Sequence, residues 1–471
     1  MRNRTFLTLA LILTFVLGAC TPAAESPSAA GSQAAASEAP ESQGGEPSSE
    51  ASAAPSEAAS ACAADSSQAD PVMEGVEEGA TITFWTYFLS PTFDEFIECT
   101  IDRFEAAYPG VTVEWEDHQA TYLDDYRNAI NAGTQPDVAN LSNNEGWVRE
   151  FAQAGALLNL SENAPQEIID QYFPNLFDDN TVDGDSYQFP WYQSIAVELI
   201  NTRIYEAAGL DPAEFPTAIS ELPDLCQTIK DETGTLCDIR LTVNNYLSQM
   251  AYEGGVDVMN EDGTEFTFDS PEAVAWLQMY VDMVAAGTVD TDALTTALDR
   301  VALLIFSAGQ AAFYQTGPQL IRVVKDSNPD LYESLALAPL PLGESGVTQP
   351  TSMAISVKAD TEFPNASMAL ASFFTGPRAM LDFAKIVPIY PSTPAAFDDP
   401  FFSEEPELIE DSARPLAREI IENQQNIMPP IPEAADVNDI VRQAVEAALF
   451  GGVPAQDALS DAVNQANALL P

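Results

Sequence analysis

The chain has 471 residues, of which 73 are acidic and 17 are basic, so its formal net charge is −56. A field of this sign repels nucleic acid and anionic lipid, and it disfavours both as direct partners. The single histidine, His118, excludes a zinc site of the HExxH type, and no GxxxxGK[ST] phosphate loop occurs in the sequence. The length suggests two or three compact units.

The first residues, 1–19, read as an export signal. An apolar run from Phe6 to Leu17 follows two arginines, and it is shorter than the ~20 residues that a membrane-spanning helix needs. The run ends in Leu17-Gly18-Ala19-Cys20, which resembles a bacterial lipobox. The resemblance implies that the peptide is cut before Cys20 and that the Cys20 thiol carries a diacylglyceryl group. The protein would then be anchored to the cell membrane and face outward; the alternative is an ordinary secretory signal.

Residues 20–79 have the composition of a tether. The stretch from Thr21 to Asp70 consists mainly of alanine and serine, with no Leu, Ile, Val or Phe and no cation. Such a segment cannot bury a core, and its glutamates repel one another. We therefore expect a disordered linker between the anchor and the globular part of the chain.

From residue 80 the pattern alternates between strands and helices. β-branched and aromatic residues predict a strand over 81–87, and a helical spacing of Phe and Ile residues follows over 93–104. Further strands are expected at 111–115 and 136–141, with a helix over 122–132 between them. This order predicts an α/β sheet with parallel strands, whose ligands lie beyond the carboxyl ends of the strands.

Long helices dominate the second half. Ser270-Pro271 is a typical helix start and Gly287 a typical end, which predicts a helix over 271–287. Further helices are expected over 365–375 and 439–450, and no internal repeat is visible.

Nine segments of this region resemble, in order, a known family: the extracellular solute-binding proteins of ABC importers, in the sugar-binding group typified by maltose-binding protein. The segments are ITFWTY (82–87), FEAAYPGVTVEW (104–115), INAGTQPDVANLSN (130–143), AQAGALLNL (152–160), FPWYQSIAVELINTRIYEAAGL (189–210), SAGQAAFYQTGP (307–318), ALAPLPLG (336–343), MAISVKAD (353–360) and NIMPPIPEAADVNDIVRQAVEAAL (426–449).

The resemblance implies a two-lobe periplasmic-binding-protein fold. Each lobe would be a mostly parallel sheet flanked by helices, and a three-segment hinge would join the lobes. The N-terminal lobe would comprise 80–193 and 352–390, and the C-terminal lobe 194–351 and 391–471. The ligand would sit between the lobes and be trapped when they close.

Sugars offer C–H faces that suit aromatic rings and hydroxyls that suit carboxylates and amides. Residues of these types occupy the positions that resemble the family's ligand-facing segments. The predicted ligand contacts are Trp85, Tyr87, Asn143, Glu145, Trp147, Trp191, Tyr192, Gln193, Asn245, Tyr246 and Gln319.

Two departures from the family pattern restrict the ligand. Gln319 stands where maltose-binding protein has a stacking tryptophan, and Asn438 stands at the position of a second aromatic platform. A mono- or disaccharide or another polyol therefore fits better than a long maltodextrin on stacked rings. The scarcity of cations in these loops disfavours an anionic ligand, whereas a cationic solute such as a polyamine stays open, because aromatic rings and carboxylates can cage cations.

The cysteines fit an oxidising compartment. Cys226 and Cys237 are eleven residues apart and flank a helix-to-strand connection, so we expect a disulfide between them. Cys62 and Cys99 could form a second one. No CxxC spacing exists, and no metal site or cofactor is expected.

Two functions of different classes remain. The first is a non-catalytic, monomeric binding lipoprotein that delivers a neutral mono- or oligosaccharide to the permease and ATPase subunits of an ABC importer. The second is a secreted glycoside hydrolase, which needs a pair of carboxylates that any of the 73 acids could supply. The order of the family segments favours the first.

Overall fold

The computed structural model describes residues 66–143, 146–179, 181–243, 245–295, 301–429 and 431–470. All of them belong to one compact unit, which spans residues 56–471. The predicted signal peptide, the lipidation site Cys20 and most of the predicted tether lie outside the described residues. Within the described part of the chain, no helix is both long enough and apolar enough to cross a membrane.

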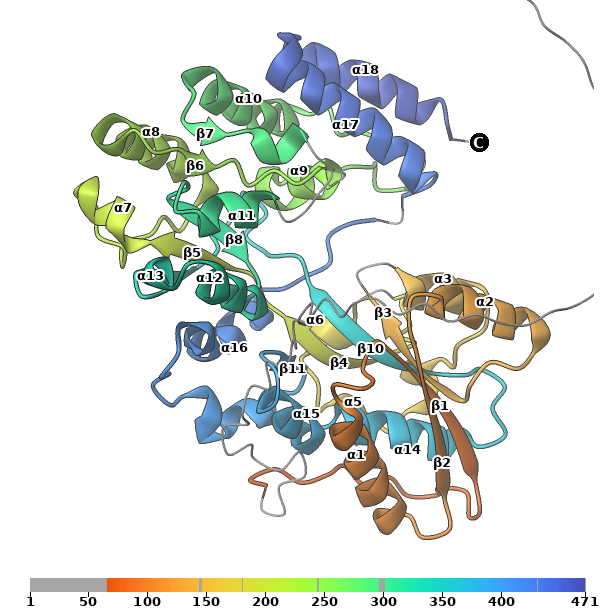
Figure 1. The fold of residues 1–471 in the computed structure, drawn as a ribbon. Coiled ribbons are helices and arrows are strands. Elements are labelled where there is room, and N and C mark those ends of the chain that lie inside the picture. The colour runs from red at the N-terminus through yellow and green to blue at the C-terminus, as the bar shows by residue number, and fades with distance from the viewer. Residues whose placement is uncertain are drawn as a thin grey trace, which may run out of the picture. The chain divides into compact units, whose positions relative to one another are not determined.

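A six-stranded sheet, whose strands are labelled in Figure 1, forms the first lobe. Its strand order is β11-β4-β10-β3-β1-β2. The strands are β1 (Thr81–Tyr87), β2 (Thr112–His118), β3 (Val138–Ser142), β4 (Phe189–Ser194), β10 (Thr351–Val357) and β11 (Tyr390–Pro391). The predicted parallel arrangement holds for β1, β2 and β3, whereas β10, β4 and β11 pair antiparallel. The expectation of mostly parallel strands is corrected here to a mixed sheet, because β10 and β11 run opposite to β1, β2, β3 and β4, and three of the five neighbouring pairs are antiparallel.

Helices cover both faces of this sheet. The alternation of side chains in β1 sends Ile82 and Phe84 to one face and Trp85 and Tyr87 to the other. The first face packs against α1 (Asp94–Ala107), α14 (Pro364–Thr375) and α15 (Pro377–Ala384). The second face packs against α2 (Tyr122–Ala132) and α3 (Trp147–Gln153). The sheet is therefore buried on both sides, and only the ends of its strands are available for ligands.

The predicted ends of the elements agree well with the structure. Gly133 ends α2 with a φ of 69°, and Gly287 ends α10 (Pro271–Ala286) with a φ of 64°. Both values lie in the left-handed region that glycine adopts without strain. The Ser270 side chain accepts a hydrogen bond from the Ala273 N–H, as expected of a helix cap.

The second lobe is built on a smaller antiparallel sheet of order β8-β5-β9, with β5 (Val197–Asn201), β8 (Phe313–Thr316) and β9 (Leu335–Pro339). One face of β5, represented by Ile200, packs into the largest apolar cluster of the described residues. That cluster includes α8 (Leu222–Thr233), α9 (Tyr246–Gly254), α10, α17 (Ala434–Gly451) and α18 (Ala455–Asn467). The opposite face, represented by Leu199, packs against α11 (Val301–Ser307) and α12 (Ile321–Ser327).

The chain passes between the two sheets at residues 195–196 and returns at 340–350. Residues 392–422, including α16 (Arg414–Glu422), pack in one apolar cluster with α15 and Tyr390 of β11. We propose that the third crossing is 423–433, which is later in the chain than the boundary at 391 that the resemblance implies.

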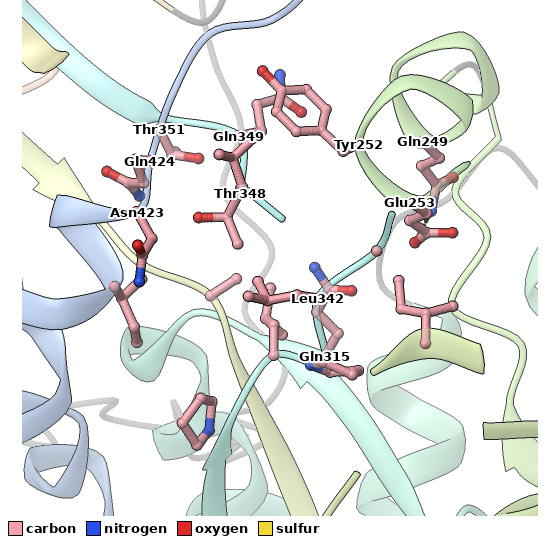
Figure 2. Close-up of a pocket in the computed structure, with 18 of the residues that line it drawn as sticks. Gln249, Tyr252, Glu253, Gln315, Leu342, Thr348, Gln349, Thr351, Asn423 and Gln424 are labelled. Carbon is pink, nitrogen blue, oxygen red and sulfur yellow. Dashed lines mark hydrogen bonds between the residues drawn. The ribbon is translucent and has the colours of Figure 1, made fainter. Parts of the chain in front are cut away.

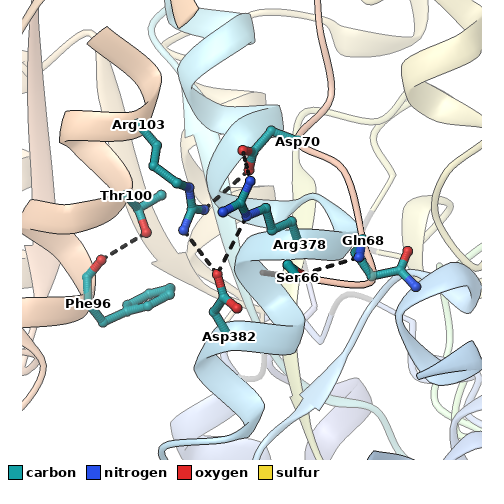
Figure 3. Close-up of polar contacts among 8 residues, drawn as sticks. All are labelled: Ser66, Gln68, Asp70, Phe96, Thr100, Arg103, Arg378 and Asp382. Carbon is teal, nitrogen blue, oxygen red and sulfur yellow. Dashed lines mark hydrogen bonds and ion pairs between the residues drawn. The ribbon is translucent and has the colours of Figure 1, made fainter. Parts of the chain in front are cut away.

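Residues 66–80 form a segment, here called the N-terminal strap, that lies on the first lobe (Figure 3). Asp70 of the strap pairs with Arg103 of α1 at 3.2 Å and with Arg378 of α15 at 3.3 Å. The buried Asp382 accepts a hydrogen bond from Arg103 at 3.0 Å and lies 3.9 Å from Arg378. Two carboxylates thus neutralise two guanidinium groups between the strap and two helices.

Further contacts continue along the strap. The Met73 N–H donates to the Tyr108 hydroxyl at 2.7 Å. The Glu77 carboxylate accepts from the backbone N–H groups of Asn365 and Ala366, which lie at the start of α14, where no side chain of the helix itself provides a cap. The packed part of the chain therefore begins before residue 80, within the segment that the sequence assigns to the tether.

The second lobe contains the expected disulfide between Cys226 and Cys237. It joins the core of α8 to β6 (Cys237–Asp238). The second expected pairing involves Cys62, which lies outside the described residues.

Candidate functional site

A cavity of about 280 Å³, here called the inner compartment, lies against the second lobe and the crossing segments (Figure 2). Its walls come from the 240–253 region, from β8, from the loop after β9, from the segment before β10 and from the end of α16. Its polar lining residues include Thr242, Asn245, Ser248, Gln249, Tyr252, Glu253, Gln315, Thr348, Gln349, Thr351, Asn423 and Gln424. Amides and hydroxyls make up most of these polar residues, and apolar residues such as Leu340, Leu342 and Ile420 line the rest of the cavity.

One face of α9 supplies the right-hand wall in Figure 2. Helical spacing places Asn245, Gln249 and Tyr252 along the same side of the helix. The Gln249 amide donates to the Arg240 carbonyl at 3.0 Å and accepts from the Thr242 N–H at 2.9 Å. These bonds fix the loop that leads into α9, so the Gln249 side chain holds this part of the wall in place.

The loop after β9 approaches α9 closely at Gly343. A Cβ atom at this position would lie 2.3 Å from the Glu253 Cα and 2.4 Å from the Glu253 carbonyl oxygen, so only glycine fits. The close approach brings the apolar residues Leu340 and Leu342 into the lining of the cavity, beside the amides.

Two side-chain oxygens in the lining are buried without a hydrogen-bond partner in the described part of the chain. They are Thr348 Oγ1 and Gln424 Oε1. The backbone groups beside them are paired, because the Thr348 N–H donates to the Asn423 carbonyl and the Gln425 N–H donates to the Thr348 carbonyl. Buried polar groups normally have partners, so these oxygens fit a ligand that supplies hydrogen-bond donors.

A buried ion pair lies behind the same wall. Glu198 of β5 has no exposed surface, and it pairs with Arg240, which lines the cavity and whose side chain is 4% exposed. Arg240 holds a backbone φ of 64°, which is uncommon for a residue with a side chain. Because Glu198 balances the charge of Arg240, this wall does not present a free cation.

Glu253 adds a carboxylate that is held in one orientation. One of its oxygens, Oε2, accepts hydrogen bonds from Trp276 Nε1 and from the Tyr280 hydroxyl, both at 2.8 Å. The Tyr252 hydroxyl donates to the Gln425 carbonyl at 3.1 Å and accepts from the Ile427 N–H at 3.2 Å. Burial raises the pKa of Tyr252 to about 12, so this hydroxyl stays neutral.

A second cavity of about 450 Å³, here called the outer compartment, adjoins the first. Gln349 lines both, and the same two chain segments, 347–351 and 423–434, contribute to both. The first lobe contributes one wall, with Asn143, Gly146, Arg149, Glu150, Gln153 and Asp179. The two compartments meet at Gln349 and are here together called the groove, and their walls come from both lobes.

The structure places two of the sequence-predicted ligand residues in this groove. Asn143 lines the outer compartment, at the carboxyl end of β3, and its side chain donates to Ser352 Oγ at 2.9 Å. Asn245 lines the inner compartment at the start of α9. Glu145 lies outside the described residues, so its predicted role remains a prediction.

Three predicted aromatic contacts, Trp85, Tyr87 and Trp147, pack together on the α2/α3 face of the first lobe. The Tyr87 and Trp147 rings meet edge to face with centroids 5.5 Å apart, and the Trp85 ring lies 4.1 Å from the His118 ring. None of the three lines either compartment of the described residues. They form an aromatic wall beside the strand ends, and contact with a ligand remains a prediction for them.

The remaining predictions fall in the core or on the surface. The structure assigns Trp191 and Gln193 of β4 to the core, because α14, α15 and Ser392 cover them completely. Tyr192 packs on Phe383, and Tyr246 is buried in the core of the second lobe. Gln319 is exposed and lines neither compartment.

Sequence reasoning missed most of the inner lining. Gln249, Tyr252 and Glu253 could have been found by extending from Asn245 along the helical period. The run Glu422-Asn423-Gln424-Gln425-Asn426 is unusually rich in amides and was also a usable signal. Gln315 and Thr348 carry no local signal, since only the fold brings them to the cavity.

No cluster of three or more His, Cys, Asp or Glu residues with the geometry of a metal site occurs among the described residues. His118 lies between Glu116 at 3.7 Å and Asp125 at 3.5 Å, away from both compartments. The described lining of the two compartments offers hydrogen-bonding groups, apolar side chains, the aromatic ring of Tyr252 and a few charges.

Comparison with known proteins agrees with this geometry. A family model described as bacterial extracellular solute-binding protein matches residues 90–381. A relative from Deinococcus radiodurans, whose name links it to an ABC transporter, is 23% identical over 240 residues, which cover 47% of this chain and 54% of the relative. The maltotriose-binding protein of Pyrococcus abyssi is 22% identical over 262 residues, covering 55% of this chain and 53% of that protein.

The matched region thus spans about half the length of these curated relatives. Among solved structures, the cyclic α-maltosyl-1,6-maltose binding protein of Arthrobacter globiformis superposes with a TM-score of 0.67 at 23% identity. The superposition covers 83% of this chain and 98% of that one. At this identity the likeness concerns the fold.

Proposed function

Because the chain belongs to the bacterial extracellular solute-binding protein family, whose members bind solutes and are not enzymes, we propose that it is the substrate-binding lipoprotein of an ABC importer. In this proposal it captures a neutral mono- or oligosaccharide between its lobes and delivers it to the membrane permease. Names of relatives and structural neighbours that refer to maltotriose and maltosyl sugars support a carbohydrate.

The observation that carries the proposal is the lining of the inner compartment. Amide and hydroxyl groups such as Gln315, Thr348 and Asn423 can both donate and accept hydrogen bonds, which matches the hydroxyls of a sugar. Leu340 and Leu342 offer an apolar surface for the C–H groups of a sugar ring. The one cation in this lining, Arg240, is balanced by Glu198, which favours a neutral ligand over an anion.

Capture would follow from contacts with both lobes. A ligand that touches the α9 wall and the opposite wall near Asn143 gains its full binding energy only when the lobes are closed, so it shifts the population toward the closed form. The lipid anchor at Cys20 would keep the two-lobed protein near the permease.

The test is a titration of the purified protein with a panel of mono-, di- and trisaccharides, followed by calorimetry and intrinsic fluorescence. We expect saturable binding of at least one saccharide, with the saccharide recovered unchanged. Hydrolysis of a glycoside by the purified protein would favour the alternative of a secreted hydrolase. Binding of a polyamine in place of any saccharide would favour the cationic alternative.

A further inference from the structure

The outer compartment contains a cation that the proposed function has not used. Arg149 of α3 lines this compartment, and its Nε is buried without a hydrogen-bond partner in the described part of the chain. No salt bridge joins Arg149 to another described residue. An arginine with a buried and unsatisfied N–H next to a cavity is costly unless something else accepts its hydrogen bonds.

The neighbouring acidic residues do not supply the missing hydrogen-bond acceptor. Glu150, the next residue along α3, turns to Arg127 of α2 and binds it through both carboxylate oxygens, at 2.8 and 2.7 Å. Asp179 lies on the same compartment and is close enough to raise the pKa of Arg149, against the larger opposite effect of burial. Asp179 therefore offsets only part of the cost of burying the Arg149 guanidinium, whose Nε–H still lacks an acceptor in the described part of the chain.

The position of Arg149 relative to the inner compartment indicates that the acceptor belongs to a bound ligand. The two cavities share Gln349, whose side chain accepts a hydrogen bond from Ser248 Oγ at 3.1 Å. The inner cavity of about 280 Å³ is at the small end of the range for ligand pockets, whereas the outer one adds about 450 Å³ along the same groove. A ligand seated in the inner compartment and longer than one sugar unit would extend past Gln349 toward Arg149.

The geometry points to Arg149 as a specificity-determining residue for ligand length. Resting on the proposed function, this inference assigns the inner compartment to one sugar unit and the outer compartment to the next. Arg149 would donate hydrogen bonds to hydroxyl or ring oxygens of that second unit, with Asp179 beside it as an acceptor for the hydroxyl protons. The preferred ligand is then a neutral oligosaccharide of at least two units.

The experiment compares the full chain with three variants, Arg149→Gln, Arg149→Lys and Arg322→Gln. Arg322 is an exposed residue of α12 that lines neither compartment, so it is the matched control for loss of one positive charge. Calorimetry measures Kd for glucose, galactose and xylose and for their di- and trisaccharides. Arg149→Lys keeps the charge but loses the planar donor fork, and it covers the case in which Arg149→Gln does not fold.

We expect Arg149→Gln to weaken the binding of di- and trisaccharides by about tenfold or more, because a hydrogen bond from a charged donor is lost. Arg149→Lys should lose several-fold on the same ligands. Binding of monosaccharides should change by less than about twofold in either variant, and Arg322→Gln should match the unchanged protein throughout.

Equal Kd values for di- and trisaccharides in the Arg149 variants and the unchanged protein would overturn the inference alone. An equal loss of affinity for monosaccharides and trisaccharides would also overturn it, since Arg149 would then not distinguish ligands by their length. If the unchanged protein binds no saccharide of any length, the proposed function fails and the inference fails with it.

Discussion

Two ion clusters in this molecule have the same chemistry and different surroundings. Near the N-terminal strap, Arg103 and Arg378 are neutralised by Asp70 and Asp382, and neither compartment of the groove includes any of the four. At the groove, the Arg240–Glu198 pair shares its arginine with the lining of the inner compartment. A buried ion pair is by itself weak evidence for function, so what distinguishes the two is the cavity beside Arg240.

We therefore expect substitutions in the two clusters to differ in their effects on protein stability and on ligand affinity. Removing a fully buried partner, Arg240 in one cluster or Asp382 in the other, leaves an uncompensated charge and is strongly destabilising in either cluster. Only the cluster at the groove should affect ligand affinity as well. The following substitutions test this separation, in order of decreasing effect.

Arg240→Ala should have the largest effect. It leaves Glu198 without its partner at a position with no exposed surface, which should cost about 3–5 kcal/mol of unfolding free energy. Chemical denaturation measures the stability, and titration with the saccharide that binds best measures the affinity. Replacing both residues together, as Arg240→Met with Glu198→Leu, should recover much of the stability but not the affinity. Recovery of both would show that Arg240 acts only as a packing residue.

Asp382→Asn should come next. The Asp382 carboxylate is 3% exposed and faces two guanidinium groups, so its loss should cost about 3 kcal/mol. Thermal and denaturant unfolding would register this loss. Saccharide affinity at a temperature where the variant is folded should be unchanged, and a changed affinity would contradict the separation between the clusters.

Asp238→Asn tests the surroundings of Arg240 through pH. Burial, together with the cross-strand neighbour Asp290, raises the pKa of Asp238 from its ordinary value of 3.8 to about 7. The folded state therefore binds this proton more tightly than the unfolded state, and the contribution of Asp238 to stability falls as the pH rises between about 4 and 7.

The Asp238→Asn variant has no carboxyl group to ionise, so it does not lose this stability as the pH rises. The free energy of unfolding of Asp238→Asn minus that of the unchanged protein should grow from pH 4 to pH 7 and then level off, as measured by urea unfolding at each pH. Asp290→Asn should produce part of the same change, because it removes one cause of the raised pKa. A difference that does not vary with pH would show that Asp238 is already ionised in the folded protein at pH 4.

Asp70→Asn should have the smallest effect. Asp70 lies on the strap with 16% of its side chain exposed, and Asp382 still neutralises part of the cluster when Asp70 is gone. We expect a loss of about 1 kcal/mol, which decreases further in high salt. Limited proteolysis should cut the variant faster within residues 66–80, because the strap would be held less firmly. An unchanged rate of cleavage would show that the apolar and backbone contacts of the strap suffice without the ion pairs.

The sequence predicted those parts of the fold whose signals are local. Thr81–Tyr87 is a strand because β-branched and aromatic residues suit a sheet that is covered on both faces, and Gly133 and Gly287 end helices because their backbone is left-handed. Neighbours along one helix, such as Asn245 and Gln249, could be inferred from a single correct residue.

The rest of the site depends on contacts between distant segments. Gln315, Thr348 and Asn423 come from three parts of the chain and share one cavity only after the crossings have formed. Trp191 has the composition of a ligand contact, but α14 and α15 cover it. The ion pairs of Asp70, which hold the strap on the first lobe, could not be predicted either, because its partners Arg103 and Arg378 are remote in sequence.

The central claim is that a saccharide is held in the groove by both lobes. A crystal structure of the protein with the saccharide that binds most tightly tests it most directly. We expect one sugar unit in the inner compartment, within hydrogen-bond distance of Thr348 and Gln424, and contacts to the first lobe at Asn143 or Arg149. A saccharide found elsewhere on the protein, or one that touches a single lobe only, would contradict the account.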